Sequence, residues 1–339
     1  MRNSIEFHGA KISKRESDAL EEIENLIRKE FSNRKDVTYS PIMFKEEEGK
    51  VIWVILSNAN LTEVPKSIKY LPNLERLNLN ENKIEQLPKF IGKFKELQQL
   101  NLSKNRLSEL PETIGNLTSL EFLNLRENNL MKLPKSIGNL HSLIELNVVG
   151  NKVTTIPKKI GNLSNLEALV VGDNNLTDIP EEITDISKLE HLSMANNPIR
   201  RFPESLCNLL SLKIIGMGEC EFTEIPECFG NLVNLKSIHA SGGQLKMLPE
   251  SIGKLKKLEY LNLWNNQLEY LPESFSELNS LEDLNLGYNR FKEFPKQLFH
   301  LPNLFDVGFD DFQLQKFEKE IKKLDARISR VKKVKNYYY

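Results

Sequence analysis

Short apolar segments recur along the chain at a fixed interval, and apolar and polar positions alternate within each segment. In one copy, Leu97, Leu100 and Leu102 form the pattern L-x-x-L-x-L, and Asn105 and Leu107 follow. Such alternation predicts a strand with one buried face and one exposed face. We expect twelve strand segments, which begin at Val51, Leu74, Leu97, Leu120, Leu143, Leu166, Leu189, Leu212, Leu235, Leu258, Leu281 and Leu304.

Prolines mark the same period. Eleven of the fifteen prolines lie 23 residues apart without interruption: Pro65, Pro88, Pro111, Pro134, Pro157, Pro180, Pro203, Pro226, Pro249, Pro272 and Pro295. Each of these prolines fixes the backbone angle φ at the start of the convex segment of its repeat, on the side opposite the strand. The missing N–H of proline costs little stability at that position. Because one repeat cannot bury its apolar side alone, we predict a solenoid in which the strands stack into a parallel sheet.

The asparagine after each strand is a second repeated feature. At Asn105, for example, a buried carboxamide can satisfy backbone N–H and C=O groups of adjacent repeats and so form a ladder. The ladder fails at Cys220 and Gly243, in two successive repeats. Since Gly243 has no side chain, we expect a change in curvature or raised mobility in repeats eight and nine.

The N-terminal residues 1–50 are expected to cap the array with a helix and strands. An amphipathic helix is predicted over 16–33, with Leu20, Ile23, Ile27 and Phe31 on one face. Two strands are predicted within 37–56, joined at 46–49. Trp53 then lies at an outward position of the first repeat, where either the cap covers it or it binds a partner.

The repeats are expected to occupy residues 51–318, with the last one partial, and residues 314–339 to form a second cap. In the last repeat Phe312 replaces the ladder asparagine. A helix is predicted over 314–331, which either shields the open sheet edge or binds a partner or a second copy. Its apolar residues are Leu314, Phe317, Ile321, Leu324, Ile328 and Val331.

The proline-bearing pattern L-P-x-x-I-G-x-L resembles the Ras-group intracellular leucine-rich-repeat proteins, with Scribble-like, plant, bacterial and archaeal members. The resemblance covers residues 51–318. It implies a right-handed α/β horseshoe with the parallel sheet on its concave side, a cytoplasmic setting, and a non-enzymatic scaffold that binds a protein there. A small GTPase is one candidate partner. The shared residues are structural, so the resemblance names none.

Charge is unevenly distributed along the chain. Residues 313–339 carry nine lysines and arginines against three acids, whereas residues 51–312 have a net charge of −6. A mildly acidic body does not fit a dedicated nucleic-acid binder. As an alternative function, the tail with Lys332, Lys333 and Lys335 beside Tyr337–Tyr339 would bind nucleic acid or an anionic membrane. The competing interpretation is a solvated helix end.

The chain has no run of 18 apolar residues and no apolar signal segment at its start, and its three cysteines are Cys207, Cys220 and Cys228. Their odd number argues against a disulfide framework and for a reducing compartment. We therefore expect three buried thiols and a cytoplasmic location.

Sequence motifs of enzymes are missing: there is no phosphate-binding loop, no H-E-x-x-H, no paired C-x-x-C and no G-x-S-x-G. His191 and His239 face the concave side two repeats apart, roughly 10 Å, which is too far to share a metal ion. We expect no catalytic residue, no metal and no cofactor.

Exposed strand positions are informative because the fold does not dictate them. Asparagine is the usual residue between the inner leucines, but repeats six to nine carry Val170, Ser193, Gly216 and His239 instead. Small and apolar residues beside exposed aromatic ones are typical of a binding hot spot. Neutral drift is the competing explanation. The predicted partner-binding residues are Val149, Ala168, Val170, His191, Ser193, Ile214, His239, Tyr260, Trp264, Asp283 and Tyr288, with Tyr260, Trp264 and Tyr288 as anchors.

Overall fold

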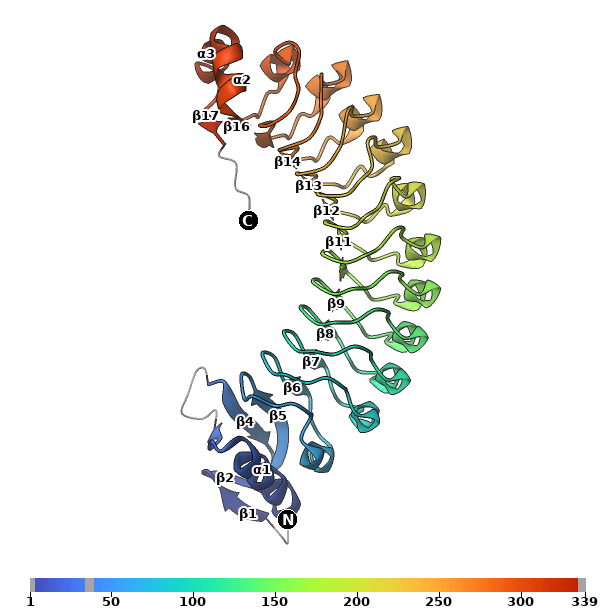
Figure 1. The fold of residues 1–339 in the computed structure, drawn as a ribbon, viewed down its shortest axis with the longest axis vertical. Coiled ribbons are helices and arrows are strands. Elements are labelled where there is room, and N and C mark those ends of the chain that lie inside the picture. The colour runs from blue at the N-terminus through green and yellow to red at the C-terminus, as the bar shows by residue number, and fades with distance from the viewer. Residues whose placement is uncertain (1–3, 34–39, 335–339) are drawn as a thin grey trace. The chain divides into compact units, whose positions relative to one another are not determined.

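The computed structural model describes residues 4–33 and 40–334, and the chain divides into two units, Met1–Leu169 and Val170–Tyr339. Each unit is a stack of coils with a short strand on one side and a 3₁₀ turn on the other (Figure 1). This arrangement confirms the predicted solenoid. Within the described residues, no helix is long and apolar enough to cross a membrane.

Unit 1 contains a sheet in which β5 to β9 are parallel neighbours, while β4 runs antiparallel to β5. The expected strand segments of these repeats are confirmed. The strands are β3 (Ser32–Asn33), β4 (Ile42–Glu47), β5 (Lys50–Leu56), β6 (Arg76–Asn78), β7 (Gln99–Asn101), β8 (Phe122–Asn124) and β9 (Glu145–Asn147). The boundary between the units falls in β10 (Ala168–Val170).

Unit 2 contains seven further strands, and β11 to β17 pair in parallel in chain order. They are β11 (His191–Ser193), β12 (Ile214–Gly216), β13 (Ser237–His239), β14 (Tyr260–Asn262), β15 (Asp283–Asn285), β16 (Asp306–Phe309) and β17 (Arg330–Lys333). In both units we call the side of the sheet that carries the first and third residue of each short strand the strand face. The middle residue points into the core and is fully buried, as Leu77 and Leu284 illustrate.

A 3₁₀ turn follows each periodic proline. The turns are η1 (Lys66–Tyr70), η2 (Lys89–Lys93), η3 (Glu112–Asn116), η4 (Lys135–Asn139), η5 (Lys158–Asn162), η6 (Glu181–Asp185), η7 (Glu204–Asn208), η8 (Glu227–Asn231), η9 (Glu250–Lys254), η10 (Glu273–Glu277) and η11 (Lys296–His300). Adjacent turns pack closely, because a Cβ on Gly115 would lie 2.4 Å from the Ser136 carbonyl oxygen. This contact explains the glycine of the I-G pair.

The asparagine ladder is present as expected. Asn128 donates from Nδ2 to the carbonyls of Leu102 (2.9 Å) and Leu125 (3.0 Å), and its Oδ1 accepts the Leu107 N–H at 3.0 Å. Asn82, Asn105, Asn151, Asn197 and Asn266 repeat these contacts. At the irregular positions, the Cys220 thiol makes one 3.5 Å contact with the Met194 carbonyl, and Gly243 has no side chain.

The N-terminal cap begins with a hairpin that the sequence did not predict, β1 (Ser4–Phe7) and β2 (Ala10–Ser13). Helix α1 (Lys14–Ile27) follows, earlier and shorter than the predicted 16–33. It begins at Lys14 because Ser13 and Glu16 form a capping box, and it ends where Arg28 adopts a left-handed φ of 54°. The Glu16 carboxylate also accepts the Val51 N–H at 3.0 Å, which ties α1 to β5.

The expected packing of this cap is present in part. Leu20 and Ile23 of α1 are fully buried, but Phe31 lies beyond the helix and packs against Phe44 of β4 with ring centroids 6.0 Å apart. Strands β4 and β5 form the predicted hairpin. The start of its predicted range, residues 37–39, lies outside the described residues.

The C-terminal cap differs from the prediction. Instead of one helix over 314–331, the chain forms α2 (Asp311–Lys316) and α3 (Glu318–Asp325), and β17 then pairs with β16. The helical prediction is therefore wrong beyond residue 325. The reason is the open sheet edge: β17 supplies the backbone partners that β16 needs.

The last ladder position was also misassigned. Phe312 is largely exposed, at 68%, and its neighbour Gln313 is buried and donates to the Leu286 carbonyl at 3.1 Å. Gln313, one residue further along, therefore makes the backbone contact that the ladder asparagine makes in the regular repeats. Phe317, Ile321 and Leu324 are buried, which favours the capping role of these helices over the alternative of a binding helix.

The cysteines require a correction. Cys207 and Cys228 form a disulfide with Cα atoms 5.6 Å apart, so the expectation of three free thiols is wrong. They belong to consecutive turns, η7 and η8, which the solenoid stacks, and a spacing of 21 residues brings them together. Cys220 is free and buried. Burial raises the pKa of its thiol to about 12, which leaves it protonated and unreactive at neutral pH.

Candidate binding surface on the strand face

The strand face of unit 2 gathers nine of the eleven predicted site residues. Strand pairing places His191, Ile214, Tyr260 and Asp283 in one row, the first position of successive strands, with Ser237 between Ile214 and Tyr260. Ser193 and His239 lie in the row of third positions, and Val170, Trp264 and Tyr288 complete the set. Val149 and Ala168 belong to unit 1. All eleven residues are at least partly exposed.

Two aromatic pairs lie on this face. The His239 ring lies 4.9 Å from the Tyr260 ring, between centroids, and Ser237 Oγ lies 3.0 Å from His239 Nε2. Trp264 and Tyr288 meet edge to face at 5.6 Å. Rings that hold one another in place lose little further freedom on binding, which is the property of an interface anchor.

Gly216, which pairs with His239, and Gly218 pack closely against the adjacent repeats. A Cβ on Gly216 would lie 2.8 Å from Ser193 Oγ, and one on Gly218 would lie 2.5 Å from the Ser241 carbonyl oxygen. These glycines therefore keep the strands of repeats seven to nine free of larger side chains. The sequence showed small residues at these positions, and their part in a binding surface stays a prediction.

Burial perturbs the titratable groups of this surface. It is the main reason why the pKa of His239 is lowered, and the charge of His191 adds to the effect. His239 is therefore neutral at pH 7. Burial also raises the pKa of Tyr260, with a further contribution from Asp283. Neutral rings on this face suit an apolar or hydrogen-bonding contact better than an ionic one.

The basic C-terminal strand covers the acidic end of the same face. Lys332 Nζ lies 3.4 Å from Asp283 and 3.2 Å from Asp306, and Arg330 pairs with Asp306. Asp283, a predicted site residue, therefore already has an intramolecular partner. The charges of β17 are engaged within unit 2, which weighs against the proposed nucleic-acid or membrane role of the tail. Lys335 and residues 337–339 lie outside the described residues.

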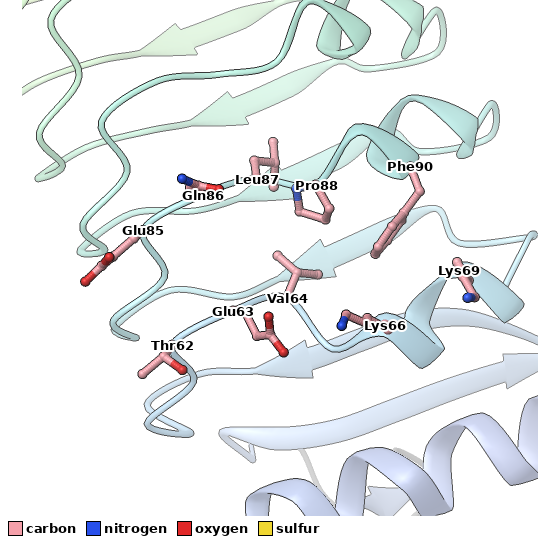
Figure 2. Close-up of a pocket in the computed structure, with 10 residues that line it drawn as sticks. All are labelled: Thr62, Glu63, Val64, Lys66, Lys69, Glu85, Gln86, Leu87, Pro88 and Phe90. Atoms are coloured by element: carbon pink, nitrogen blue, oxygen red, sulfur yellow. The ribbon is translucent and has the colours of Figure 1, made fainter.

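Two open grooves lie on the flank of the repeats rather than on the strand face. Figure 2 shows the one in unit 1, a cavity of about 480 Å³ bordered by side chains such as Glu63, Lys66 and Phe90. The groove in unit 2 includes the same ten repeat positions nine repeats later, from Glu269 to Gln297. A groove that recurs at equivalent positions follows from the repeat geometry and marks no specific site.

Sequence reasoning missed a pocket on the strand face of unit 1, with a volume of about 440 Å³. Trp53 lines it together with Met43 of β4, so the cap contributes to the surroundings of Trp53. Whether Trp53 binds a partner stays a prediction. The signal that could have found the pocket is the row of polar residues next to Trp53. The lining residues are Ser40, Met43, Trp53, Ile55, Ser57, Arg76, Leu77, Asn78, Asn80, Gln99 and Asn101.

Known proteins share this architecture. The family described as a leucine-rich repeat region matches residues 53–125, 121–202 and 200–325. A search of curated proteins found no match. A solved leucine-rich-repeat protein of Leptospira interrogans is 31% identical, with a TM-score of 0.59, over 80% of this chain and 81% of that chain.

Two further solved structures are similar. An internalin of Listeria monocytogenes is 19% identical with a TM-score of 0.65 over 95% of this chain and 96% of its own, which shows the fold alone. The structure of PEPR1–AtPEP1 is 26% identical with a TM-score of 0.61, over 80% of this chain and 44% of that chain. The family match spans most of the strands and turns described above, so the chain belongs to the leucine-rich-repeat family.

Proposed function

We propose that the protein is a non-enzymatic binding module that holds a protein partner on the strand face of unit 2. The observation that carries this proposal is the pair of partly exposed aromatic contacts, His239–Tyr260 and Trp264–Tyr288, beside a strand that carries glycine instead of a larger side chain. Rigid aromatic side chains next to a shallow apolar surface supply contact area at a low cost in entropy.

The test is an affinity purification from the source organism with three forms of the protein. The double variant Trp264→Ala/Tyr288→Ala removes one aromatic pair, and Tyr270→Ala removes an exposed aromatic side chain on the flank as a matched control. We expect proteins captured by the wild type and by Tyr270→Ala to be lost with the double variant, because truncating a hot-spot aromatic costs about 2 kcal/mol or more. Capture of the same proteins by the double variant, at unchanged thermal stability, would refute the proposal.

The Ras-group resemblance adds two finer proposals, a small GTPase as the partner and the cytoplasm as the location. The Cys207–Cys228 disulfide argues against the second, since disulfides persist in oxidising compartments. Direct binding of a purified GTP-loaded small GTPase, lost in the Trp264→Ala/Tyr288→Ala variant, would support the first. If no binding is detected at micromolar protein concentrations, the proposal of a small GTPase as the partner is wrong.

A further inference from the structure

A row of asparagines runs along the strand face of unit 1, at the third position of β6 to β9. In Asn78, Asn101, Asn124 and Asn147, the side chain accepts the backbone N–H two residues further on, at 3.0 to 3.1 Å. A backbone N–H can only donate, so the accepting atom is Oδ1 in every case. The opposite end of each carboxamide, the NH₂ group, is a donor, and within the described residues it has no protein acceptor.

The strand-face pocket of unit 1 lies at the start of this row and includes Asn78 and Asn101. Arg76 is the one charged residue among those that line it. The Arg76 guanidinium stacks 4.2 Å from the centre of the Trp53 ring, and the Lys45 ammonium lies 4.6 Å from the same centre. The stacking holds the guanidinium plane in place, so its planar set of donors is oriented before any ligand arrives.

The net charge of unit 1 is positive, as are the Arg76 and Lys45 side chains beside the pocket. Residues 1–169 contain 25 lysines and arginines against 22 acids, a net charge of +3, whereas residues 170–339 contain 21 against 25, a net charge of −4. The lining of the pocket holds no acidic residue. Amide donors and a fixed guanidinium therefore face the ligand without a competing carboxylate.

We propose that this pocket binds a short acidic segment of a protein partner, with an aspartate or glutamate side chain on Arg76 and further acceptors of that segment on the asparagine row. A carboxylate has acceptors only, which matches the donors of the Arg76 guanidinium and of the asparagine NH₂ groups, and it pairs with guanidinium in a two-point geometry. Glu145, on the same face at β9, would repel a long polyanion, so a short segment fits better than a nucleic acid. The surface is separate from the one proposed in unit 2.

The probe is a hexapeptide of alternating glycine and glutamate, capped at both ends so that only side-chain carboxylates carry charge. Extended, it spans about 20 Å, the width of four strands at about 4.8 Å each. The same peptide with glutamine keeps the acceptors without charge, and one with lysine reverses the charge. We expect the glutamate peptide to bind the full chain most tightly in calorimetric titration, and the lysine peptide not to bind.

Two substitutions test the chemistry. Arg76→Gln removes the charged donors, and Asn101→Asp keeps the acceptor for Ser103 while it replaces the outward donor with a charged acceptor. We expect each to weaken binding of the glutamate peptide at least tenfold. The matched controls are Arg200→Gln, whose arginine pairs with Glu221 in unit 2, and Asn285→Asp, the same exchange on the same type of turn in unit 2. Both should bind like the wild type.

Equal binding by wild type, Arg76→Gln and Asn101→Asp would overturn the proposal. So would equal binding of the three peptides, or no saturable binding of the glutamate peptide up to about 1 mM. The Trp264→Ala/Tyr288→Ala variant should retain peptide binding, which separates the failure of this site from the failure of the unit 2 surface. Circular dichroism of each variant checks that the repeats remain folded.

Discussion

Gly243 interrupts the asparagine ladder, and replacing it with asparagine is expected to stabilise the protein. In a regular repeat Asn128 makes three hydrogen bonds of 2.9 to 3.0 Å to the backbone of its own and the preceding repeat. Five periods further along the chain, the groups equivalent to those partners are the Met217 and Ala240 carbonyls and the Phe222 N–H. The backbone φ of Gly243 is not in the left-handed region, so an asparagine can adopt it.

The size of the effect follows from these contacts. Three hydrogen bonds at about 1 kcal/mol each contribute about 3 kcal/mol, and ordering the new side chain costs about 1 kcal/mol. A Cβ at this position would lie 2.9 Å from Asn266 Oδ1, which accepts the Leu245 N–H, so the Asn266 side chain has to shift at some cost in strain. Losing the flexible glycine from the unfolded chain adds about 0.5 kcal/mol, which offsets this strain. The net gain in unfolding free energy is about 2 kcal/mol.

Urea denaturation followed by circular dichroism measures this gain for Gly243→Asn. The control Gly243→Ala brings the same Cβ contact without the carboxamide, and Asn128→Gly removes a regular ladder residue and should lose about 3 kcal/mol. Hydrogen exchange at the Phe222 N–H should slow in Gly243→Asn alone. If Gly243→Asn is no more stable than Gly243→Ala, the ladder contacts do not carry the stability assigned to them, and the reasoning fails.

Two further predictions concern the disulfide and His239. Replacing Cys207 and Cys228 together by serine should lower the unfolding free energy by about 3 kcal/mol in non-reducing buffer, from the loop of 21 residues that the bond closes; a chemical denaturation curve that does not change would contradict this. Because burial lowers the pKa of His239, the unfolded chain takes up a proton more readily than the folded one. Unfolding free energy should therefore fall as pH drops below about 6.5, and less so in His239→Gln. A midpoint of His239 at or above 6.5 in an NMR titration would show the opposite.

The repeats could be predicted from the sequence because the same 23-residue pattern recurs in successive copies. Leu77 and Leu284 are buried by the same alternation, and the equivalent prolines Pro65 and Pro295 precede the same kind of turn. An irregular residue in one repeat therefore does not mislead the prediction, because the neighbouring repeats show the regular pattern. The ends have no such redundancy. There α1 begins at the capping box of Ser13 and Glu16. The left-handed φ of Arg28 ends it three residues before Phe31, although the apolar spacing of Phe31 fits a longer helix, and Phe31 packs against Phe44 instead.

The C-terminal cap shows a different limit. The spacing of Ile328 and Val331 fits a helix, but β16 has a free edge, and pairing its backbone outweighs helical periodicity in a segment of this length. The Cys207–Cys228 bond was missed for a related reason. An odd count of cysteines says nothing about which two turns the solenoid stacks side by side, and only the stacking brings η7 and η8 together.

The two kinds of asparagine explain why membership of this family predicts the fold but not the ligand. At Asn105 both ends of the carboxamide are consumed: Nδ2 donates to the Leu79 and Leu102 carbonyls, and Oδ1 accepts the Ile84 N–H. At Asn101, four residues earlier, Oδ1 alone is used, and the NH₂ group is left on the strand face. In the sequence both positions are simply asparagine. A ligand meets only the second kind, so its chemistry has to be deduced from which atoms the fold leaves unused rather than from which residues it repeats.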